Sequence, residues 1–372
     1  MNRIGLWYGA MAAVAAGAAL MGGCLPDDMP AYTNGGKTVV AVAQGPSGQA
    51  LWTYDVQSGK VTPYSLPDKW QLQSARMLGD QVWVRGGLRH EQDPAKHWEH
   101  SCKRFDPVKN EFVAGPPALE GRDWLSGAIP ASDEGKMCLF VPSAAQPSNN
   151  EGKIDYDVFS FPEIKQMKWV KLDQVIPAGR FWWLTLKVKK QKDGSREIGN
   201  VDLFNAEGKK VVTITNEEGR KMKYQGGREF PAYARLSEDF AVLLLALGEQ
   251  GGYNFGVFDT GTGKFLWGGS TRFVLKGNPL VKRTEVWAIE GRSDIALVRH
   301  TPGEEAGKDK QDRYVINPAN PGADQLTPSP DGSHFVMVIN GGKDKPSRLL
   351  FIPIKEGVAE KDVRSVELKT EK

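Results

Sequence analysis

The chain has 372 residues, of which 40% are hydrophobic and 25% are charged, so it is long enough to enclose a large buried core. Its formal net charge of only +3 excludes a general electrostatic affinity for nucleic acid or anionic lipid. Three cysteines exclude a disulfide-dense scaffold, and none of them belongs to a C-x-x-C redox or zinc pair.

The N-terminal segment has the pattern of a secretory signal. A short positive start, Met1–Arg3, precedes the apolar stretch Ile4–Leu20, and the segment ends in Gly22-Gly23-Cys24. Small residues before a cysteine resemble the lipobox of bacterial lipoproteins, which implies that Cys24 carries a lipid and becomes the new N-terminus. An ordinary signal peptide or a retained membrane-spanning helix is the alternative.

The lipobox resemblance sets the expected domain boundaries. We expect a signal peptide over 1–23, a lipidated tether over 24–36 and one folded domain over 37–368. Leu25 stands where proteobacterial sorting places Asp for inner-membrane retention, so a lipid anchor in the outer membrane is favoured, facing the periplasm or the cell surface.

A hairpin pattern recurs seven times after the leader. In each copy an apolar strand runs into a polar turn, where Asp or Asn can bond its own backbone and Gly can take the positive φ that a hairpin needs. The seven copies begin at Trp52, Arg104, Val158, Leu203, Val257, Val315 and Phe351.

Strands that are apolar on consecutive residues lie upstream of these hairpins, which is typical of strands covered on both faces. They are Val39–Val42, Gln81–Val84, Met137–Val141, Phe181–Leu186, Phe240–Leu247, Ile295–Val298 and Phe335–Ile339. A further short strand precedes most of them, as in Trp70–Met77, Trp124–Ile129, Phe230–Leu236 and Glu285–Ile289. Four strands per unit with a period of about 45–55 residues predict the blade of a β-propeller.

The predicted fold is therefore all-β, a propeller of seven four-stranded blades, with six or eight blades as alternatives. A β-sandwich would need fewer, longer strands and no sevenfold repeat. A βαβ fold would need helical patterns between the strands, which the sequence lacks.

Two segments resemble known propeller families. Phe258–Trp267 is similar to a PQQ-like repeat, and Ser329–Ser333 before Phe335 is similar to the blade opening of TolB-like and WD-repeat propellers. The resemblance implies the fold and no particular activity, because such propellers serve as scaffolds, ligand binders and enzymes.

Long polar connections are expected between the second and third strands, and these would emerge on one face of the propeller. Long loops on one rim of a rigid scaffold are where binding usually occurs. The connections are Gly86–Trp98, Ser143–Lys153, Lys190–Arg196, Leu247–Gly252, Thr301–Asp312 and Asn340–Ser347.

Charged and aromatic residues open several of the expected inner strands, where they would ring the mouth of the central channel. Such groups can hold a sugar, a peptide or a small anion. The alternative is that the aromatic rings wedge between blades and the charges pair among themselves. The candidate ligand-binding residues are Trp70, Arg122, Trp124, Arg228 and Phe230.

Two smaller clusters of residues suggest further sites. His90, His97 and His100 lie close together in the sequence and can form a metal site, against the alternative of exposed or hydrogen-bonded histidines. Cys102 and Cys138 fall on neighbouring blades, where they form either one disulfide or two buried thiols.

No catalytic signature, phosphate-binding loop or cofactor motif is present in the sequence. We therefore favour a membrane-anchored, non-catalytic binding or assembly scaffold of the bacterial cell envelope, without a cofactor. This prediction loosely follows the PQQ-type propeller lipoprotein of outer-membrane protein assembly. The expected partner is an envelope protein, a peptide or a glycan. A channel-centred enzyme of the lyase, lactonase or glycosidase type is the alternative.

Overall fold

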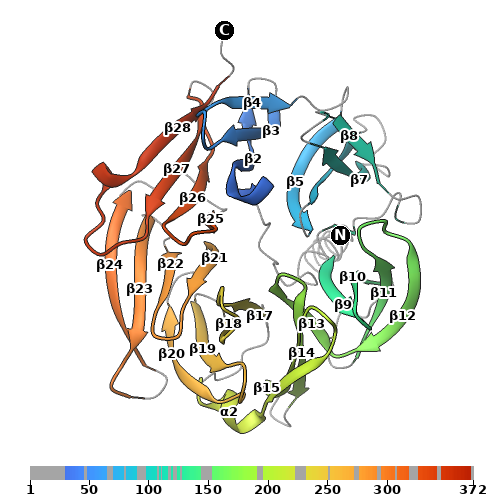
Figure 1. Cartoon of the computed structure of the whole chain (residues 1–372), viewed down its shortest axis with the longest axis vertical. Coiled ribbons are helices and arrows are strands. Elements are labelled where there is room, and N and C mark those ends of the chain that lie inside the picture. Colours follow the sequence, from blue (N-terminus) through green and yellow to red (C-terminus); the bar gives the residue numbers. More distant parts are fainter. Residues whose placement is uncertain are drawn as a thin grey trace, which may run out of the picture.

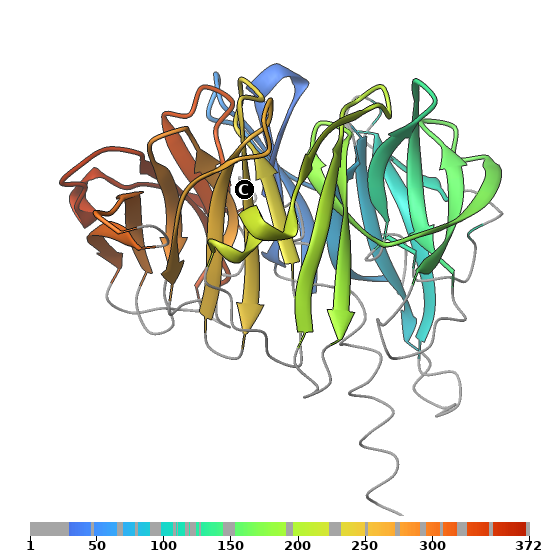
Figure 2. The ribbon, with the colours of Figure 1, turned by 90° about the horizontal axis from the view of Figure 1, so that it is seen from below.

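Seven antiparallel sheets of four strands each stand around a common axis in the computed structural model of the chain, seen along its shortest axis in Figure 1 and from the side in Figure 2. The predicted all-β propeller of seven blades is therefore confirmed. The structure describes residues 30–369 except for 46–47, 65–69, 79–80, 90–97, 107–108, 110, 116–118, 120–123, 126–127, 144–152, 191–195, 223–231, 250–251, 272–275, 291–294, 306–307, 318–325 and 342–344.

Each blade is built from four consecutive strands, of which the first lies nearest the axis. Blade 1 contains β1 (Ala31–Thr33), β2 (Thr38–Gly45), β3 (Gly48–Asp55) and β4 (Val61–Tyr64). Blade 2 contains β5 (Trp70–Leu78), β6 (Gln81–Arg89), β7 (Trp98–Asp106) and β8 (Glu111–Ala114). Blade 3 contains β9 (Ile129–Asp133), β10 (Lys136–Pro142), β11 (Ile154–Ser160) and β12 (Gln166–Leu172). Blade 4 contains β13 (Gln174–Gly179), β14 (Trp182–Lys190), β15 (Arg196–Phe204) and β16 (Lys210–Ile214).

The remaining blades repeat this order. Blade 5 contains β17 (Ala232–Leu236), β18 (Val242–Glu249), β19 (Gly252–Asp259) and β20 (Phe265–Thr271). Blade 6 contains β21 (Lys276–Val281), β22 (Val286–Glu290), β23 (Ile295–Pro302) and β24 (Asp309–Asn317). Blade 7 contains β25 (Leu326–Pro328), β26 (His334–Ile339), β27 (Ser347–Pro353) and β28 (Arg364–Leu368).

Helical structure in the described residues is limited to short segments, namely η1 (Asn34–Gly36), α2 (Asn216–Arg220) and η4 (Glu360–Asp362). Among the residues that the structure describes, no helix is both long enough and apolar enough to span a membrane. The β-sheets therefore supply the core of the fold.

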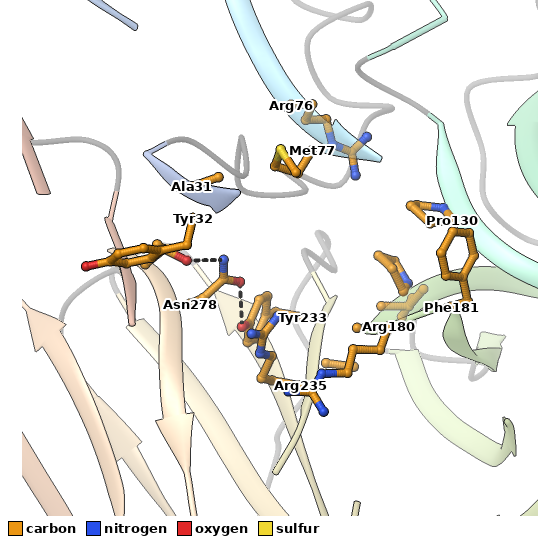
Figure 3. Close-up of a pocket in the computed structure, with 15 residues that line it drawn as sticks. Ala31, Tyr32, Arg76, Met77, Pro130, Arg180, Phe181, Tyr233, Arg235 and Asn278 are labelled. Atoms are coloured by element: carbon orange, nitrogen blue, oxygen red, sulfur yellow. Dashed lines mark hydrogen bonds between the residues drawn. The ribbon is translucent and has the colours of Figure 1, made fainter. Parts of the chain in front are cut away.

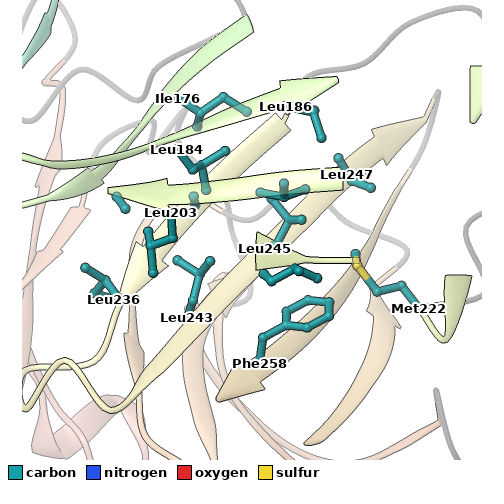
Figure 4. Close-up of a cluster of buried hydrophobic side chains, with 14 residues drawn as sticks. Ile176, Leu184, Leu186, Leu203, Met222, Leu236, Leu243, Leu245, Leu247 and Phe258 are labelled. Carbon is teal, nitrogen blue, oxygen red and sulfur yellow. The ribbon is translucent and has the colours of Figure 1, made fainter. Parts of the chain in front are cut away.

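The hydrophobic core is divided into seven clusters, one at each junction between neighbouring blades. Figure 4 shows the cluster between blades 4 and 5, where Leu184 and Leu203 pack against Leu243 and Leu245. Burying a leucine side chain of this kind contributes about 1.5–3 kcal/mol. The fold is thus stabilised by seven separate sheet-to-sheet contacts.

Strand β18 shows why the second strands are apolar on consecutive residues. Leu243 and Leu245 face blade 4, whereas Val242 and Leu244 belong to the cluster between blades 5 and 6. All four side chains are fully buried. Because successive side chains of a strand point to opposite faces, a strand between two packed blades needs apolar residues at every position.

The hairpin turns between third and fourth strands have the predicted chemistry. Asp259 Oδ1 accepts hydrogen bonds from the backbone N–H of Gly261 and Thr262, and Gly263 takes a φ of 71°. Asp55 Oδ1 accepts one from the backbone N–H of Ser58, 2.6 Å away, in the equivalent turn of blade 1. The Asp-to-Gly pattern therefore fixes these turns locally.

The first and last blades meet through side chains, since each blade is continuous in sequence. Arg364 Nη1 donates a hydrogen bond to the hydroxyl of Tyr54, 3.0 Å away, and its guanidinium lies 4.1 Å from the centre of the Phe351 ring. Tyr54 and Phe351 also pack with a centroid separation of 5.3 Å. These contacts close the ring.

Three element assignments differ from the predictions. The propeller begins at Ala31, inside the expected tether, because β1 pairs with β2. The first strand of blade 3 begins at Ile129 rather than at Trp124. In blade 6, Glu285–Ile289 corresponds to the second strand and Ile295–Val298 to the third, so the expected Val315 hairpin lies at the end of the fourth strand.

Candidate functional site

A cavity of about 270 Å³ lies on the propeller axis, and the first strand of every blade contributes to its wall (Figure 3). One lining residue from each of the seven first strands, in blade order, is Tyr32, Arg76, Pro130, Pro177, Tyr233, Asn278 and Thr327. The closed ring of blades thus brings together residues that lie far apart in the sequence.

The cavity reaches the end of the channel where the first strands end. Gly179 is the last residue of β13, Arg235 is next to last in β17, and Arg180 and Phe181 form the turn into β14. Because the strands of a blade are antiparallel, connections between second and third strands emerge at the opposite end. The cavity is therefore not on the long-loop face. Of the expected long connections, Thr301–Asp312 joins the third and fourth strands of blade 6 instead of the second and third, so it emerges at the same end as the cavity, and most of the others fall outside the described residues.

Arginine is the only charged residue type among the described residues that line the cavity, and it occurs three times. Figure 3 shows Arg180 and Arg235 on one side of the channel and Arg76 on the other. Arg76 is only 3% exposed, and its Nη1 donates hydrogen bonds to the backbone oxygens of Leu125 and Ala128, 2.8 and 2.7 Å away. Arg76 therefore also connects blade 2 to blade 3.

The turn that presents Arg180 has an unusual backbone. Arg180 and Phe181 have φ angles of 50° and 62°, between the paired residues Gly179 and Trp182. Two-residue hairpin turns with positive φ at both positions strongly prefer sequences such as Asn-Gly. Side chains with a Cβ in this region cost about 1–2 kcal/mol each. Strain of this kind tends to be kept at functional sites.

A β-bulge precedes this turn, because the register of β13 against β14 shifts between Pro177 and Gly179. Bulges re-aim side chains and occur often beside binding and active sites. The corresponding turn of blade 3 carries Glu134-Gly135, with glycine at the second position. Blade 4 thus has Phe181 where the turn of blade 3 has glycine, and Phe181 borders the cavity.

Aromatic rings hold Arg180 in place. Its guanidinium lies 5.4 Å from the centre of the Phe240 ring, and Phe240 stacks on Trp182 with centroids 5.2 Å apart. A cation over an aromatic face is stabilised by about 0.5–1 kcal/mol at exposed sites. The stack restrains the guanidinium at the end of the channel.

Arg235 lies beside the same turn. A Cβ atom placed on Gly179 would be 3.4 Å from Nη1 of Arg235, so the guanidinium borders the residue that precedes Arg180. No carboxylate of a described residue forms an ion pair with Arg180 or Arg235. Two positive charges from neighbouring blades therefore share one side of the cavity.

Neutral polar groups form another part of the wall. The Tyr233 hydroxyl donates a hydrogen bond to Oδ1 of Asn278, 3.2 Å away, and Asn278 Nδ2 lies 3.5 Å from the Thr327 hydroxyl oxygen. Asn278 is 6% exposed. An amide nitrogen carries two hydrogens, so Asn278 retains a donor for a ligand.

Tyr32 connects the wall to blade 7. Its hydroxyl lies 2.6 Å from Nε2 of His334, and burial raises the pKa of Tyr32 above its usual value. The described residues that line the cavity include no carboxyl, imidazole or thiol group. Their chemistry suits the binding of an anion or a polar molecule.

The predicted channel-mouth residues that the structure describes pack between blades, which corrects their expected position. Trp70 is 7% exposed in the cluster between blades 1 and 2, and its Nε1 donates a hydrogen bond to the Ser101 hydroxyl, 2.6 Å away. Trp124 is 2% exposed and contacts Trp83 edge-on, with a centroid separation of 5.2 Å. Neither tryptophan lines the cavity.

Several predicted residues fall outside the described part of the chain. They are Cys24, His90, His97, Arg122, Arg228 and Phe230, and of His100 only the backbone in β7 is described. Among the residues that the structure does describe, no group of three His, Cys, Asp or Glu side chains is placed to hold a metal ion.

Cys102 and Cys138 are both buried thiols, and they belong to different core clusters. Cys102 packs between blades 2 and 3, whereas Cys138 packs between blades 3 and 4. Burial raises the pKa of Cys138 to about 12, so its reactive thiolate form is suppressed.

A charged network in blade 6 was not apparent in the sequence. His300 is fully buried, with Nδ1 2.6 Å from Asp309 Oδ2 and Nε2 2.9 Å from Glu290 Oε1. Both ring nitrogens face carboxylates, so both carry a proton. Burial lowers the pKa of His300, but the hydrogen bonds and charges of Asp309 and Glu290 outweigh it and raise the pKa to about 9.

No family model matches the sequence, and no curated protein matches it. Among solved structures, a putative 6-phosphogluconolactonase from Bacteroides fragilis is 12% identical, with a TM-score of 0.43, over 89% of this chain and 98% of that chain. TolB from Acinetobacter baumannii is 13% identical, with a TM-score of 0.38, over 88% and 78%. The Dos1 propeller is 10% identical, with a TM-score of 0.44, over 91% of each chain. These similarities concern the fold and identify no activity.

Proposed function

We propose that this chain is a membrane-anchored, non-catalytic binding or assembly scaffold of the bacterial cell envelope, and that it holds a ligand in the cavity on the propeller axis. The supporting observation is the composition of the cavity wall. Arginine, tyrosine and asparagine side chains converge there, whereas the described lining residues include no carboxyl, imidazole or thiol group.

This composition favours binding over acid–base catalysis. General acid–base catalysis near neutral pH relies mostly on imidazole or carboxyl groups within hydrogen-bond reach of the substrate. Guanidinium, amide and phenol groups instead supply charge and directional hydrogen bonds. The N-terminal sequence is the reason for including the envelope location and a lipid at Cys24 in this proposal. The proposed surface for an envelope partner is the end of the propeller that carries the connections between second and third strands.

Ligand retention tests the proposal. The full chain, solubilised in detergent, is incubated with small molecules extracted from the bacterial envelope, separated from unbound compounds and denatured, and the released compounds are identified by mass spectrometry. We expect compounds to be enriched on the protein and recovered chemically unchanged. Enrichment should be lost when Arg180 and Arg235 are both replaced by methionine.

A control variant removes two positive charges far from the cavity. Lys109→Met with Lys308→Met changes side chains that are 68% and 65% exposed, so it should retain ligands like the original chain. Conversion of a compound into a new product, abolished by the double arginine variant, would establish an enzyme instead. Absence of any retained compound would also overturn the proposal.

A further inference from the structure

We propose that the ligand of this cavity is a small organic anion, and that Arg180 and Arg235 together bind its carboxylate or phosphate group. The inference rests on the proposed binding function and specifies the ligand class. It depends on two guanidinium groups that pair with no carboxylate of a described residue, on the strained turn that positions Arg180, and on the size of the cavity.

The charge is concentrated and not neutralised by described side chains. Arg180 and Arg235 lie on adjacent blades beside Gly179, and neither forms an ion pair with a carboxylate of a described residue. Arg76 adds a third positive charge across the channel. Like charges inside a recess with protein walls focus the electrostatic field and attract an anion.

The guanidinium group favours particular anions. It presents planar pairs of N–H donors that match the two oxygens of a carboxylate or phosphate. Arg180 is restrained over Phe240, which limits the side-chain entropy lost on binding. The positive φ angles of Arg180 and Phe181 strain the backbone, and this strain is the cost of directing the Arg180 side chain into the cavity.

The cavity also limits the size of the ligand and the neutral groups that it can carry. Its volume of about 270 Å³ lies just below the ~300–1,000 Å³ of ordinary small-molecule pockets, so the ligand is small. Tyr233 and Asn278 supply neutral hydrogen-bonding groups in another part of the wall. A hydroxyl group on the ligand fits this part, so hydroxy acids and phosphorylated polyols are the favoured class.

A matched pair of probes tests the charge requirement. Tartrate and threitol share one four-carbon skeleton with two central hydroxyl groups, but only tartrate carries carboxylates. Isothermal titration calorimetry at low salt should show binding of tartrate and of inorganic phosphate, and none of threitol. Raising the salt to physiological strength should weaken the binding of both anions.

The arginines are tested one at a time. Arg180→Met and Arg235→Met should each weaken tartrate binding about tenfold or more, since each removes charge-assisted hydrogen bonds to the anion. Arg235→Lys keeps the charge but loses the paired donors, so its affinity should lie between those of the original chain and Arg235→Met. The control Lys109→Met should bind tartrate normally.

Two results would overturn this inference and leave the proposed function standing. One is that compounds retained from the envelope extract carry no carboxylate, phosphate or sulfate group. The other is that threitol binds as well as tartrate, or that the single arginine variants bind tartrate like the original chain. Absence of any retained compound in the extract experiment contradicts the proposed function itself.

Discussion

The imidazole of His300 is fully buried, with Nδ1 2.6 Å from Oδ2 of Asp309. Its other nitrogen faces Glu290 at 2.9 Å, so one positive charge lies between two carboxylates on the face of blade 6 that packs against blade 5, where the ring also contacts Phe255. Gln311 Nε2 donates a further hydrogen bond to Asp309 Oδ2, 3.1 Å away. Buried charges of this kind are tolerated only when they are paired and hydrogen-bonded.

We predict that this network makes stability fall at alkaline pH. The pKa of His300 is raised to about 9 in the folded protein, above its ordinary value of 6.5. The stabilisation is therefore fully present below about pH 6.5 and is lost as pH rises through about 9. A shift of this size corresponds to roughly 3 kcal/mol. Denaturant unfolding between these pH values measures the loss.

The variant His300→Gln serves as the comparison, because glutamine does not titrate in this range. We expect it to be less stable by about 3–5 kcal/mol at neutral pH, since it leaves a buried carboxylate unpaired. Its stability should change much less between neutral and alkaline pH. An equally steep decline in both proteins would mean that other groups cause the pH dependence.

We predict that Gly269 is required for the same network. A Cβ atom on Gly269 of β20 would overlap the Asp309 carboxylate, which is held in place by His300 and Gln311. Gly269→Ala should therefore destabilise the protein by about 1–3 kcal/mol, as overpacking usually does. Gly219→Ala in α2 is the matched control, because nothing lies within 4 Å of its Cβ position. It should be neutral or stabilising by up to about 1 kcal/mol.

Local sequence patterns were sufficient for the fold. The consecutive leucines Leu243, Leu244 and Leu245 indicated a strand covered on both faces, and the structure places two of them toward blade 4 and one toward blade 6. The turn from Asp259 to Gly263 is equally predictable from the sequence, because its hydrogen bonds join residues that are close in the sequence. Features of this kind need no knowledge of distant contacts.

The sequence predicts the start of blade 6 at its second strand, Val286–Glu290, because the true first strand has no clear strand pattern. This first strand contains Gly277 and Pro279, and its pairing register shifts between Lys276 and Leu280, so it lacks an apolar run. The site residue Asn278 was missed with it. Arg180 and Arg235 were not predicted because ring closure brings them together, and the positive φ of Arg180 has no local signature.

We predict that Trp70 is structural and does not contribute to ligand binding. Trp70→Phe removes the hydrogen bond to Ser101 within the core and should cost about 1–2 kcal/mol of stability. Trp169→Ala changes a side chain that is 69% exposed and should alter stability by no more than about 0.5 kcal/mol. Ligand retention should be unchanged in both variants. A selective loss of retention in Trp70→Phe would return this tryptophan to the binding site.

We predict that Cys24→Ala moves the protein from the membrane fraction to the soluble fraction. Cys24 lies outside the described residues, and the expectation comes from the small residues that precede it. An acyl anchor contributes about 0.8 kcal/mol for each buried CH₂ group, so its removal should release the chain. Fractionation and the mass of the N-terminal peptide measure the effect, with Cys102→Ala as the variant that should stay in the membrane. Unaltered fractionation of Cys24→Ala would exclude lipid anchoring at this residue.

We predict that Arg180→Asn separates stability from ligand binding. Asparagine tolerates the positive φ of 50° at this position, which offsets the loss of about 0.5–1 kcal/mol from the contact with Phe240. The free energy of unfolding should therefore change by less than about 1 kcal/mol, while tartrate binding weakens about tenfold or more. Glu134→Asn makes the same change at the equivalent turn of blade 3, where the backbone φ is also 50°, and should leave tartrate binding intact. If Arg180→Asn instead destabilised the protein by more than about 2 kcal/mol and still bound tartrate normally, the strained turn would serve blade packing, and the positive φ of Arg180 would have no connection with a ligand.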